Sequence, residues 1–341
     1  MNSESIPMHR VAVVRPFARL LADIGAPVER GFRQAGLPLY ALENVNNFVP
    51  SHRFWKFLVT MVRSEGILDL GFRVGDNFGA DCTDPHMTAL LTKAPTLYQG
   101  LRNASELING TVTNFRMGIL QPPNCGYAYF YHQPSCQADN PAIEQIGWYG
   151  LTIWREMVRV YAGSQWQPTE IGLMTNHMPC RYIQERYPNT RMRLSQPFSY
   201  LVLENTLLSL PPLHSRAAPS ELSSLDYDPL PNKFISSLEM LLQSYIEDSD
   251  LSIEIVAGLC NMSKRTLQRK LKEEGTYYRE VLDHELFRVA CLMLQNSPDM
   301  KLTDITIHMG YSDVSSFARA FRRIAGVTPK VYRQQFNQLA R

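Results

Sequence analysis

The sequence predicts an α+β domain over its first two thirds and an all-α domain at its C-terminus. Three observations support this fold class. Residues 1–210 begin with helical apolar spacing and then change to alternating segments rich in β-branched and aromatic residues. Residues 211–231 hold five prolines and four serines, which is typical of a linker. Residues 232–341 have helical spacing and contain two similar short segments about fifty residues apart.

The bulk composition alone excludes few classes of function. A chain of 341 residues is long enough for two domains, and its formal net charge is only +2, so any anionic partner must be argued from local charge. No apolar run reaches the length of a membrane helix, and arginines interrupt any N-terminal signal core. We therefore expect a soluble, cytoplasmic protein without membrane contact. The six cysteines are scattered, and we expect no metal and no cofactor.

The N-terminal domain is expected to begin with helices. Apolar residues spaced three and four apart precede Gly25, which suits a helix C-cap. A second pattern is capped by Ser51, and a third is entered at Thr96. Each pattern places one apolar stripe toward a core.

Strands are expected to follow these helices. Residues 111–120 alternate, and residues 126–133 are dense in aromatics after a turn, so together they predict a hairpin. Residues 141–163 return to helical spacing, and further strands are predicted within 169–176 and 198–205. The result is the α+β assignment of residues 1–210.

The C-terminal domain opens with an amphipathic helix over 232–248 and then predicts a helix-turn-helix unit. Ser252 can cap a short helix that carries Val256 and Ala257 inward, together with Ile253 and Cys260. After a short turn, Ser263 can cap a second helix that buries Leu267 and Leu271. Two short helices joined by a tight turn form a helix-turn-helix.

The same plan recurs near the C-terminus. Residues 302–310 predict a first helix with Thr303 as its cap, and residues 313–326 predict a second that buries Phe317 and Phe321. Asp313 favours the start of this helix, and Gly326 suits its end. No acidic residue follows Asp313.

The two units stand apart by a distance that suits DNA. Residues 276–298 predict a continuous helix of about 19 residues, or roughly 28 Å. Successive major-groove faces of B-DNA lie roughly 34 Å apart. One chain can therefore present two basic helices to adjacent turns of a duplex, which favours double-stranded promoter DNA as the partner. A solvated charged face is the plainer alternative.

The basic helices also carry the side chains that read bases. Arginine can bond guanine and glutamine can bond adenine with two hydrogen bonds each. Arg265, Gln268 and Arg269 lie outward on the second helix of the first unit. Ser315 and Arg319 occupy corresponding places on the second helix of the second unit. We expect these five to contact bases. The remaining basic side chains are expected to contact the DNA backbone: Lys264, Lys272, Arg322 and Arg323.

Residues 233–336 resemble the DNA-binding domain of the AraC/XylS family of bacterial transcription regulators. The resemblance lies in "VAGLCNMSKRTLQRKLKEEG" and in "MGYSDVSSFARAFRRIAGVTPKVYR". Carried over by position, the base-reading sites of the family fall on the same five residues. Val314 and Ala318 depart from the polar readers of some relatives, so the second helix is expected to read fewer bases or to contact a thymine methyl group. Thr306 stands where the family has a small alanine.

The N-terminal domain resembles the arabinose-binding-like domain of one subgroup of these regulators. The similar stretches are residues 20–42, 66–76 and 90–108. The resemblance implies a small-molecule effector and a homodimer formed through this domain, without establishing that arabinose is bound. RNA polymerase is a further partner that such a regulator implies.

Enzyme signatures are absent from the sequence, and we expect no catalytic activity. The aromatic composition around Tyr129, His132 and Trp154 suits either an effector pocket or ordinary core packing, and the effector-binding residues stay unassigned.

The sequence thus predicts a sequence-specific transcriptional regulator modulated by an effector. Two alternatives stay open. Protein–protein contacts at the N-terminal domain could control it instead of a small ligand. The C-terminal helices could also grip a protein rather than DNA.

Overall fold

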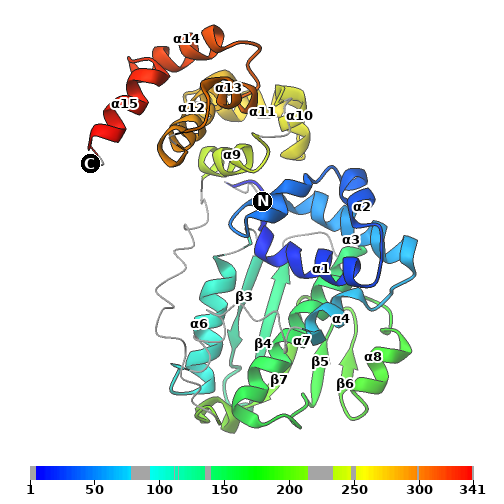
Figure 1. Cartoon of the computed structure of the whole chain (residues 1–341). Coiled ribbons are helices and arrows are strands. Elements are labelled where there is room, and N and C mark those ends of the chain that lie inside the picture. The colour runs from blue at the N-terminus through cyan, green and yellow to red at the C-terminus, as the bar shows by residue number, and fades with distance from the viewer. Residues whose placement is uncertain are drawn as a thin grey trace. The chain divides into compact units, whose positions relative to one another are not determined.

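The computed structural model describes residues 5–77, 93–110, 112–113, 115–134, 140–213, 233–246, 251–297 and 299–339. Most of the predicted linker, residues 211–231, lies outside these ranges. The chain divides into two compact units, and Figure 1 labels their elements. One unit comprises residues 8–37 and 53–230, and we call it the sheet unit. The other comprises residues 1–7, 38–52 and 231–341, and we call it the helical unit.

The sheet unit is built on five strands in the order β3-β4-β7-β5-β6. Their bounds are β3 Phe115–Leu120, β4 Tyr127–Pro134, β5 Glu170–Gly172, β6 Arg191–Arg193 and β7 Ser199–Glu204. The predicted β3–β4 hairpin is confirmed, and β4–β7 and β7–β5 are also antiparallel. The parallel partner of β5, strand β6, was not predicted from the sequence.

Strand β4 shows how one face of the sheet is buried. Its residues alternate between buried and partly exposed positions, so that Ala128, Phe130 and His132 point to one face. The long helix α7, Ala142–Ala162, packs on this face, and the Phe130 and Trp154 rings lie 4.6 Å apart. The predicted helix over 141–163 is therefore confirmed, and its aromatic stripe forms part of the core.

A second helix lies so close to α7 that only glycine fits. Helix α4, Leu70–Asp76, carries Gly71, at which an added Cβ would stand 1.9 Å from the carbonyl oxygen of Gln145. The Gln145 side chain also accepts a hydrogen bond from the Gly71 amide at 2.8 Å. Helix α7 is thus covered by the sheet on one side and by α4 on another, which explains why more than a single stripe of α7 is buried.

The remaining elements are mostly helices, three of them 13 to 15 residues long, and the unit boundary at residue 53 falls inside one of them, α3. Thr96 caps α6 as predicted, because its hydroxyl accepts a hydrogen bond from the Gln99 amide at 3.3 Å. Gly25 has a φ of 78° just beyond the end of α1, as expected for a C-terminal glycine. The bounds are β1 Met8–Arg10, α1 Val11–Asp23, α2 Val28–Ala35, α3 Ser51–Glu65, α6 Leu97–Asn109, α8 Arg181–Arg186 and η3 Asn205–Ser209.

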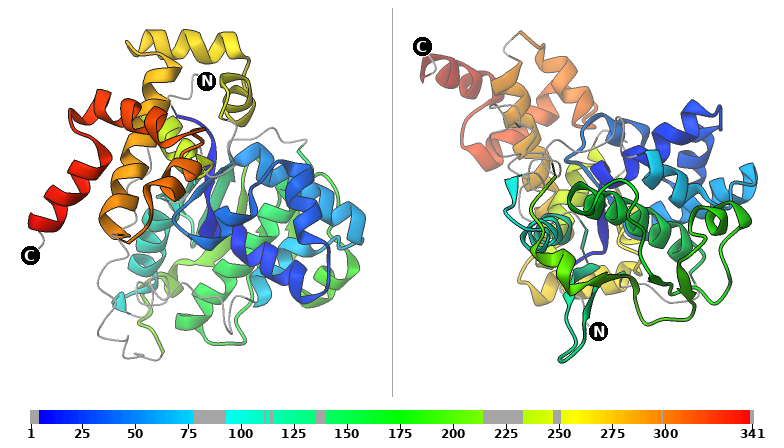
Figure 2. Two further views of the ribbon diagram at one scale, coloured as in Figure 1. Left: turned by 45° about the horizontal axis from the view of Figure 1, so that its top comes forward. Right: turned by 90° about the horizontal axis from the view of Figure 1, so that it is seen from below.

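The helical unit contains seven labelled helices after the predicted linker. These are α9 Phe234–Gln243, α10 Ile253–Leu259, α11 Lys264–Glu273, α12 Tyr278–Asn296, α13 Leu302–His308, α14 Val314–Ala325 and α15 Pro329–Leu339. In Figure 2 the yellow α10–α11 pair and the orange to red α13–α14 pair lie apart, and α12 joins them in sequence. The predicted fold class, α+β followed by all-α, is confirmed.

An early segment of the chain also belongs to the helical unit. Residues 38–52 contain the short helix η1 Leu39–Glu43 and the strand β2 Phe48–Pro50. The Phe48 amide donates a buried hydrogen bond of 2.8 Å to the Ser244 hydroxyl just beyond α9. This contribution from residues 38–52 was not predicted from the sequence, because nothing local marks it.

None of the helices within the described ranges combines the length and the hydropathy that a membrane crossing would need.

His132 is a buried ionisable group whose state depends on pH. The ring is 1% exposed, stacks 5.5 Å from Phe115 and meets Trp154 at 4.6 Å. Neither ring nitrogen has a hydrogen-bond partner among the described residues. Burial lowers the pKa of His132 to about 3, and it does the same for His9 elsewhere in this unit. Both rings are therefore neutral in the folded protein at neutral pH.

We predict that replacing His132 by leucine makes the sheet unit less sensitive to acid. The stability that neutral His132 contributes is complete above the unfolded pKa of about 6.5 and is lost as pH falls toward 3. Between these values, unfolding takes up one proton at His132. The free energy of unfolding, followed by tryptophan fluorescence in urea, should therefore fall less steeply with decreasing pH in the variant, by about 1.4 kcal/mol per pH unit. An unchanged slope would contradict a buried neutral ring.

Candidate nucleic-acid interface

Both predicted helix-turn-helix units are present, and each turn has a residue in the left-handed conformation at its second position. In the first unit, residues 260–263 join α10 to α11, and Asn261 has a φ of 54°. In the second, residues 309–313 join α13 to α14, and Gly310 has a φ of 70°. Left-handed backbone is accessible mainly to glycine and, among other residues, to asparagine or aspartate. The turns therefore reverse the chain at equivalent points.

Side-chain caps set where the second helix of each unit begins. Ser263 accepts a hydrogen bond from the Thr266 amide at 3.1 Å, and Asp313 accepts one from the Ser316 amide at 2.8 Å. Ser252 caps α10 through the Ile255 amide at 3.4 Å. The predictions for Ser252 and Ser263 are confirmed, and Asp313 is the N-cap itself. These caps satisfy amides that the helix cannot bond internally.

The cap predicted for α13 is wrong. This helix begins at Leu302 with Lys301 at its N-cap and no side-chain cap bond, so Thr303 lies inside the first turn. The Thr303 hydroxyl instead lies 3.5 Å from the carboxylate of Asp304. Because the N-cap lies two residues earlier than predicted, Thr303 falls inside the helix instead of at its cap.

Buried anchors fix the rotation of each basic helix. Leu267 and Leu271 are buried on α11, and Phe317 and Phe321 are buried on α14, as predicted. Phe321 lies 4.8 Å from Phe287 of α12, so α14 is held against that helix. With these side chains inward, the opposite face of each helix must point to solvent.

The five polar side chains predicted on α11 are all exposed. Two of them form ion pairs with exposed acids: Lys264 Nζ lies 2.6 Å from Glu254, and Arg269 Nη1 lies 2.6 Å from Glu273. Such exposed pairs contribute little to stability, so either cation can exchange its partner for a phosphate or a base. The five residues are Lys264, Arg265, Gln268, Arg269 and Lys272.

On α14 the predicted residues divide into two groups. Ser315, Arg319 and Arg322 are exposed, and Arg319 donates a hydrogen bond of 3.1 Å to the Ser316 hydroxyl. Arg323 is exposed over most of its side chain but donates to the carboxylate of Asp283 on α12. Sequence reasoning missed this partner, which lies 40 positions away.

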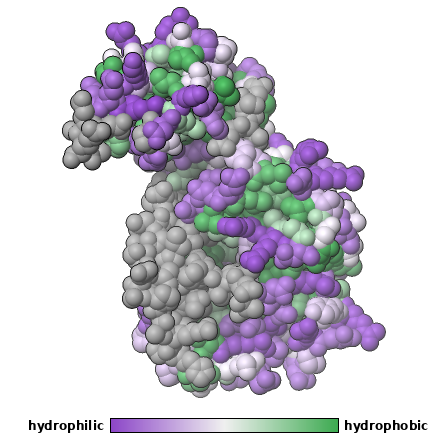
Figure 3. Space-filling model, in the orientation of Figure 1, coloured by the Kyte–Doolittle hydropathy of each residue, from purple (hydrophilic) through white to green (hydrophobic). Residues whose placement is uncertain are grey.

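Helix α12 sets the separation of the two units. It contains 19 residues, as predicted, and therefore spans roughly 28 Å. In the view of Figure 3, hydrophilic side chains cover much of the visible face of the helical unit, with smaller apolar patches between them. A polar surface of this kind suits contact with solvent or with a charged partner.

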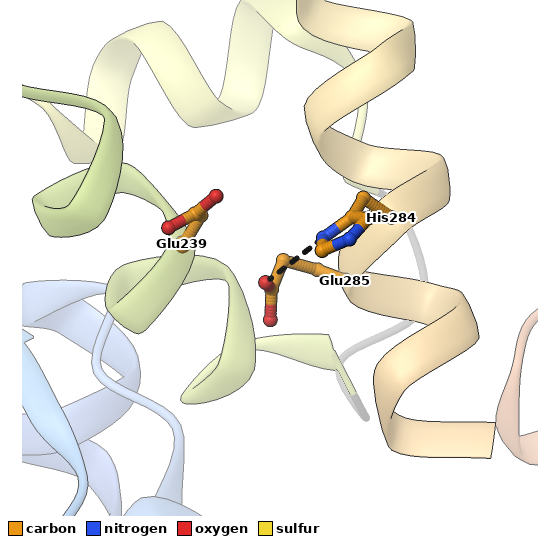
Figure 4. A group of neighbouring side chains, drawn as sticks. All are labelled: Glu239, His284 and Glu285. Carbon is orange, nitrogen blue, oxygen red and sulfur yellow. Dashed lines mark ion pairs between the residues drawn. The ribbon is translucent and has the colours of Figure 1, made fainter. Parts of the chain in front are cut away.

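One group in the described part of the chain has the donor atoms of a metal site. Figure 4 shows it: Glu239 on α9 faces His284 and Glu285 on α12, with ligand atoms within 4.8 Å of one another. The buried Glu285 carboxylate is, however, already bonded at 3.0 Å by Arg288 Nε and at 3.0 Å by Gln243 Nε2. Burial and the Glu285 charge raise the pKa of Glu239. We interpret the group as a polar contact that ties α9 to α12.

The aromatic residues considered for an effector pocket do not all meet. His132 and Trp154 lie together in the core of the sheet unit, whereas Tyr129 faces the other side of β4 and lies 4.8 Å from Tyr200. The first two positions are therefore core residues in this structure. The effector-binding residues stay unassigned.

Comparison with known proteins gives a family match within the helical unit and relatives that match part of the chain. Residues 256–335 match the family model described as a helix-turn-helix domain. An uncharacterized HTH-type transcriptional regulator of Mycobacterium tuberculosis is 40% identical over 77 residues, 23% of this chain and 22% of the relative. The HTH-type transcriptional regulator VqsM of Pseudomonas aeruginosa is 35% identical over 102 residues, 29% of this chain and 30% of the relative.

These matches establish a domain, not a whole-chain relationship. The aligned part spans between about a fifth and a third of the length of these curated relatives. Among solved structures, the transcriptional regulator CdpR of Pseudomonas aeruginosa aligns over 95% of this chain and 98% of its own, at 19% identity and a TM-score of 0.45. The C-terminal helices are a helix-turn-helix domain of the AraC type, as the sequence indicated.

We predict that Asp313→Ala loosens the first turn of α14. Hydrogen bonds from the Ser316 hydroxyl and amide lower the pKa of Asp313, so the charged carboxylate is the capping form. The amide of Ser316 should exchange with deuterium faster in the variant, because its acceptor is gone. In the parent protein the same acceleration should appear as pH falls through the lowered pKa of Asp313, after correction for intrinsic exchange. Ser315→Ala, in the same exposed turn, should leave this amide unchanged, and equal exchange in both variants would contradict the cap.

Proposed function

We propose that this chain is a sequence-specific transcriptional regulator that inserts α11 and α14 into adjacent major grooves of promoter DNA. One observation carries the proposal: each is the capped, basic second helix of a helix-turn-helix, and the 19-residue α12 lies between the two units in sequence. The family match of residues 256–335 and the names of the relatives support the same class of function.

In this proposal α11 is the main reader of bases. Arg265 and Arg269 offer paired donors to guanine, and Gln268 can both donate to and accept from adenine. Lys264 and Lys272 are placed on the DNA backbone, where lysine binds phosphate without regard to sequence. Binding would replace the Arg269–Glu273 ion pair by a contact to a base.

Helix α14 is proposed to contact fewer bases than α11. Ser315 and Arg319 are its base-reading side chains, and Arg322 is assigned to the backbone. Val314 and Ala318 are partly buried and apolar, so at most they would contact a thymine methyl group. Arg323 is not assigned to a base here, because its guanidinium already donates to Asp283.

The N-terminal domain, which we continue to take as residues 1–210, is proposed to sense a small-molecule effector and to form a homodimer. Residues 211–231 are proposed as the linker and residues 232–341 as the DNA-binding domain. The alternative, control by protein contacts at the N-terminal domain, agrees with apolar side chains on the surface of the sheet unit, such as Leu68 and Ile24. RNA polymerase and a cytoplasmic location complete the proposal, which involves no enzymatic activity.

The proposal predicts that Arg269→Ala weakens binding to a site selected from random DNA by about 1–3 kcal/mol and relaxes base preference at one position. The matched control is Lys270→Ala. It removes the same charge from the same helix, but Lys270 lies over the Phe234 ring of α9, at 5.1 Å, rather than on the outer face. The measurement is fluorescence anisotropy with the selected duplex and with base-substituted duplexes.

The control should retain the base preference of the parent protein. Affinity of the parent should also fall steeply as salt rises, because phosphate contacts release counterions. Equal effects of the two substitutions on affinity and base preference would show that Arg269 does not contact a base. Absence of DNA binding at low salt would refute the proposed function and favour a protein partner.

A further inference from the structure

Asp283 is a carboxylate in an unusual position on α12. Its side chain is only 11% exposed, and the side chains around it are largely apolar or aromatic: Leu286, Phe287, Tyr311, Phe317 and Phe321. Burial and the nearby Asp283 charge raise the pKa of the Tyr311 hydroxyl, so this surrounding is poorly hydrated. A buried carboxylate needs compensating charge, because removing an ion from water is costly.

Two arginines from different helices supply that charge. Arg279 lies one turn earlier on α12, with its Nε 2.9 Å from Asp283 Oδ1. Arg323 lies near the end of α14, and its Nη2 donates to Asp283 Oδ2. One carboxylate thus joins the N-terminal part of α12, which follows the first helix-turn-helix, to the basic helix of the second.

The position of Arg323 distinguishes it from its neighbour. Arg322 is also exposed, but it has no ion-pair partner among the described residues. The apolar contact of Phe321 with Phe287 holds α14 at its core side, and apolar burial is not directional. An ion pair to a fixed, partly buried carboxylate adds a directional constraint at the outer side of α14.

We propose that the Asp283–Arg323 ion pair is a clamp that sets the orientation of α14 against α12, and that Arg323 is a positioning residue rather than a phosphate contact. The clamp controls how sharply the second half-site is read, because base discrimination requires Ser315 and Arg319 to meet base edges at hydrogen-bond distance. This inference rests on the proposed DNA-binding function and adds a specificity determinant to it.

The effect of one substitution on DNA binding distinguishes the clamp from a purely electrostatic role of Asp283. Asp283→Asn removes a negative charge from a DNA-binding unit, so a purely electrostatic role would tighten binding to every duplex. Such a uniform change would leave discrimination between duplexes unaltered, whereas the clamp predicts that discrimination between the selected second half-site and a scrambled one should fall about tenfold. Binding to the first half-site alone should be unaffected.

The experiment uses the full chain and compares Arg323→Ala with Arg322→Ala. Affinity is measured from low to high salt for the selected duplex and for one with a scrambled second half-site. Arg322→Ala should reduce the slope of log affinity against log salt by about 0.9 and leave discrimination intact. Arg323→Ala should leave the slope unchanged and reduce discrimination about tenfold. Arg323→Lys, which keeps the charge, should retain most of the discrimination of the parent protein.

A double substitution tests the coupling. If Asp283 and Arg323 act as one clamp, Asp283→Asn combined with Arg323→Ala should lose no more discrimination than either change alone. Arg323 is 63% exposed, so its replacement leaves the core intact even if Asp283→Asn destabilises the unit. The clamp is overturned if Arg323→Ala behaves like Arg322→Ala, or if the two losses add. A parent protein without site selectivity would instead refute the proposed function.

Discussion

A ten-residue helix with five basic side chains does not hold its own shape in water. Helix α11 is such a helix, since isolated helices of this length are marginal and its like charges repel one another. Its conformation depends on the burial of Leu267 and Leu271 and on the cap from Ser263. The same constraint applies to α14 with Phe317, Phe321 and Asp313. The outer faces of both helices are available for the proposed DNA contacts because the inner faces are buried in the domain core.

Local signals made most of this arrangement predictable. A cap residue followed by apolar residues at helical spacing located α10 and α11, an acidic residue at the helix start marked α14, and helical spacing alone located the long α12, since capping and periodicity are local properties. At α13 local reasoning placed the cap at Thr303, which was wrong, because the N-cap is Lys301 and no side chain bonds there. Strand β6 was missed because three residues with two exposed arginines carry no apolar alternation.

Non-local contacts could not be predicted in this way. The bond from Phe48 to Ser244 and the ion pair from Arg323 to Asp283 join residues that are 196 and 40 positions apart. Nothing in either local segment marks its partner. The same holds for the aromatic stripe around Trp154, because its composition fits a ligand pocket and a packed core equally well. Among the described residues, the buried ring of His132, whose nitrogens have no hydrogen-bond partner, identifies core packing.

The central claim is that α11 and α14 act on one duplex as a pair held at a fixed separation by α12. It is tested most directly by inserting five base pairs between the two halves of a site selected from random DNA. Half a helical turn carries the second half-site to the opposite side of the duplex. Affinity should then fall to that of the first half-site alone, a loss of about tenfold or more. Unchanged affinity for the lengthened site would show that the two helices do not bind as a pair.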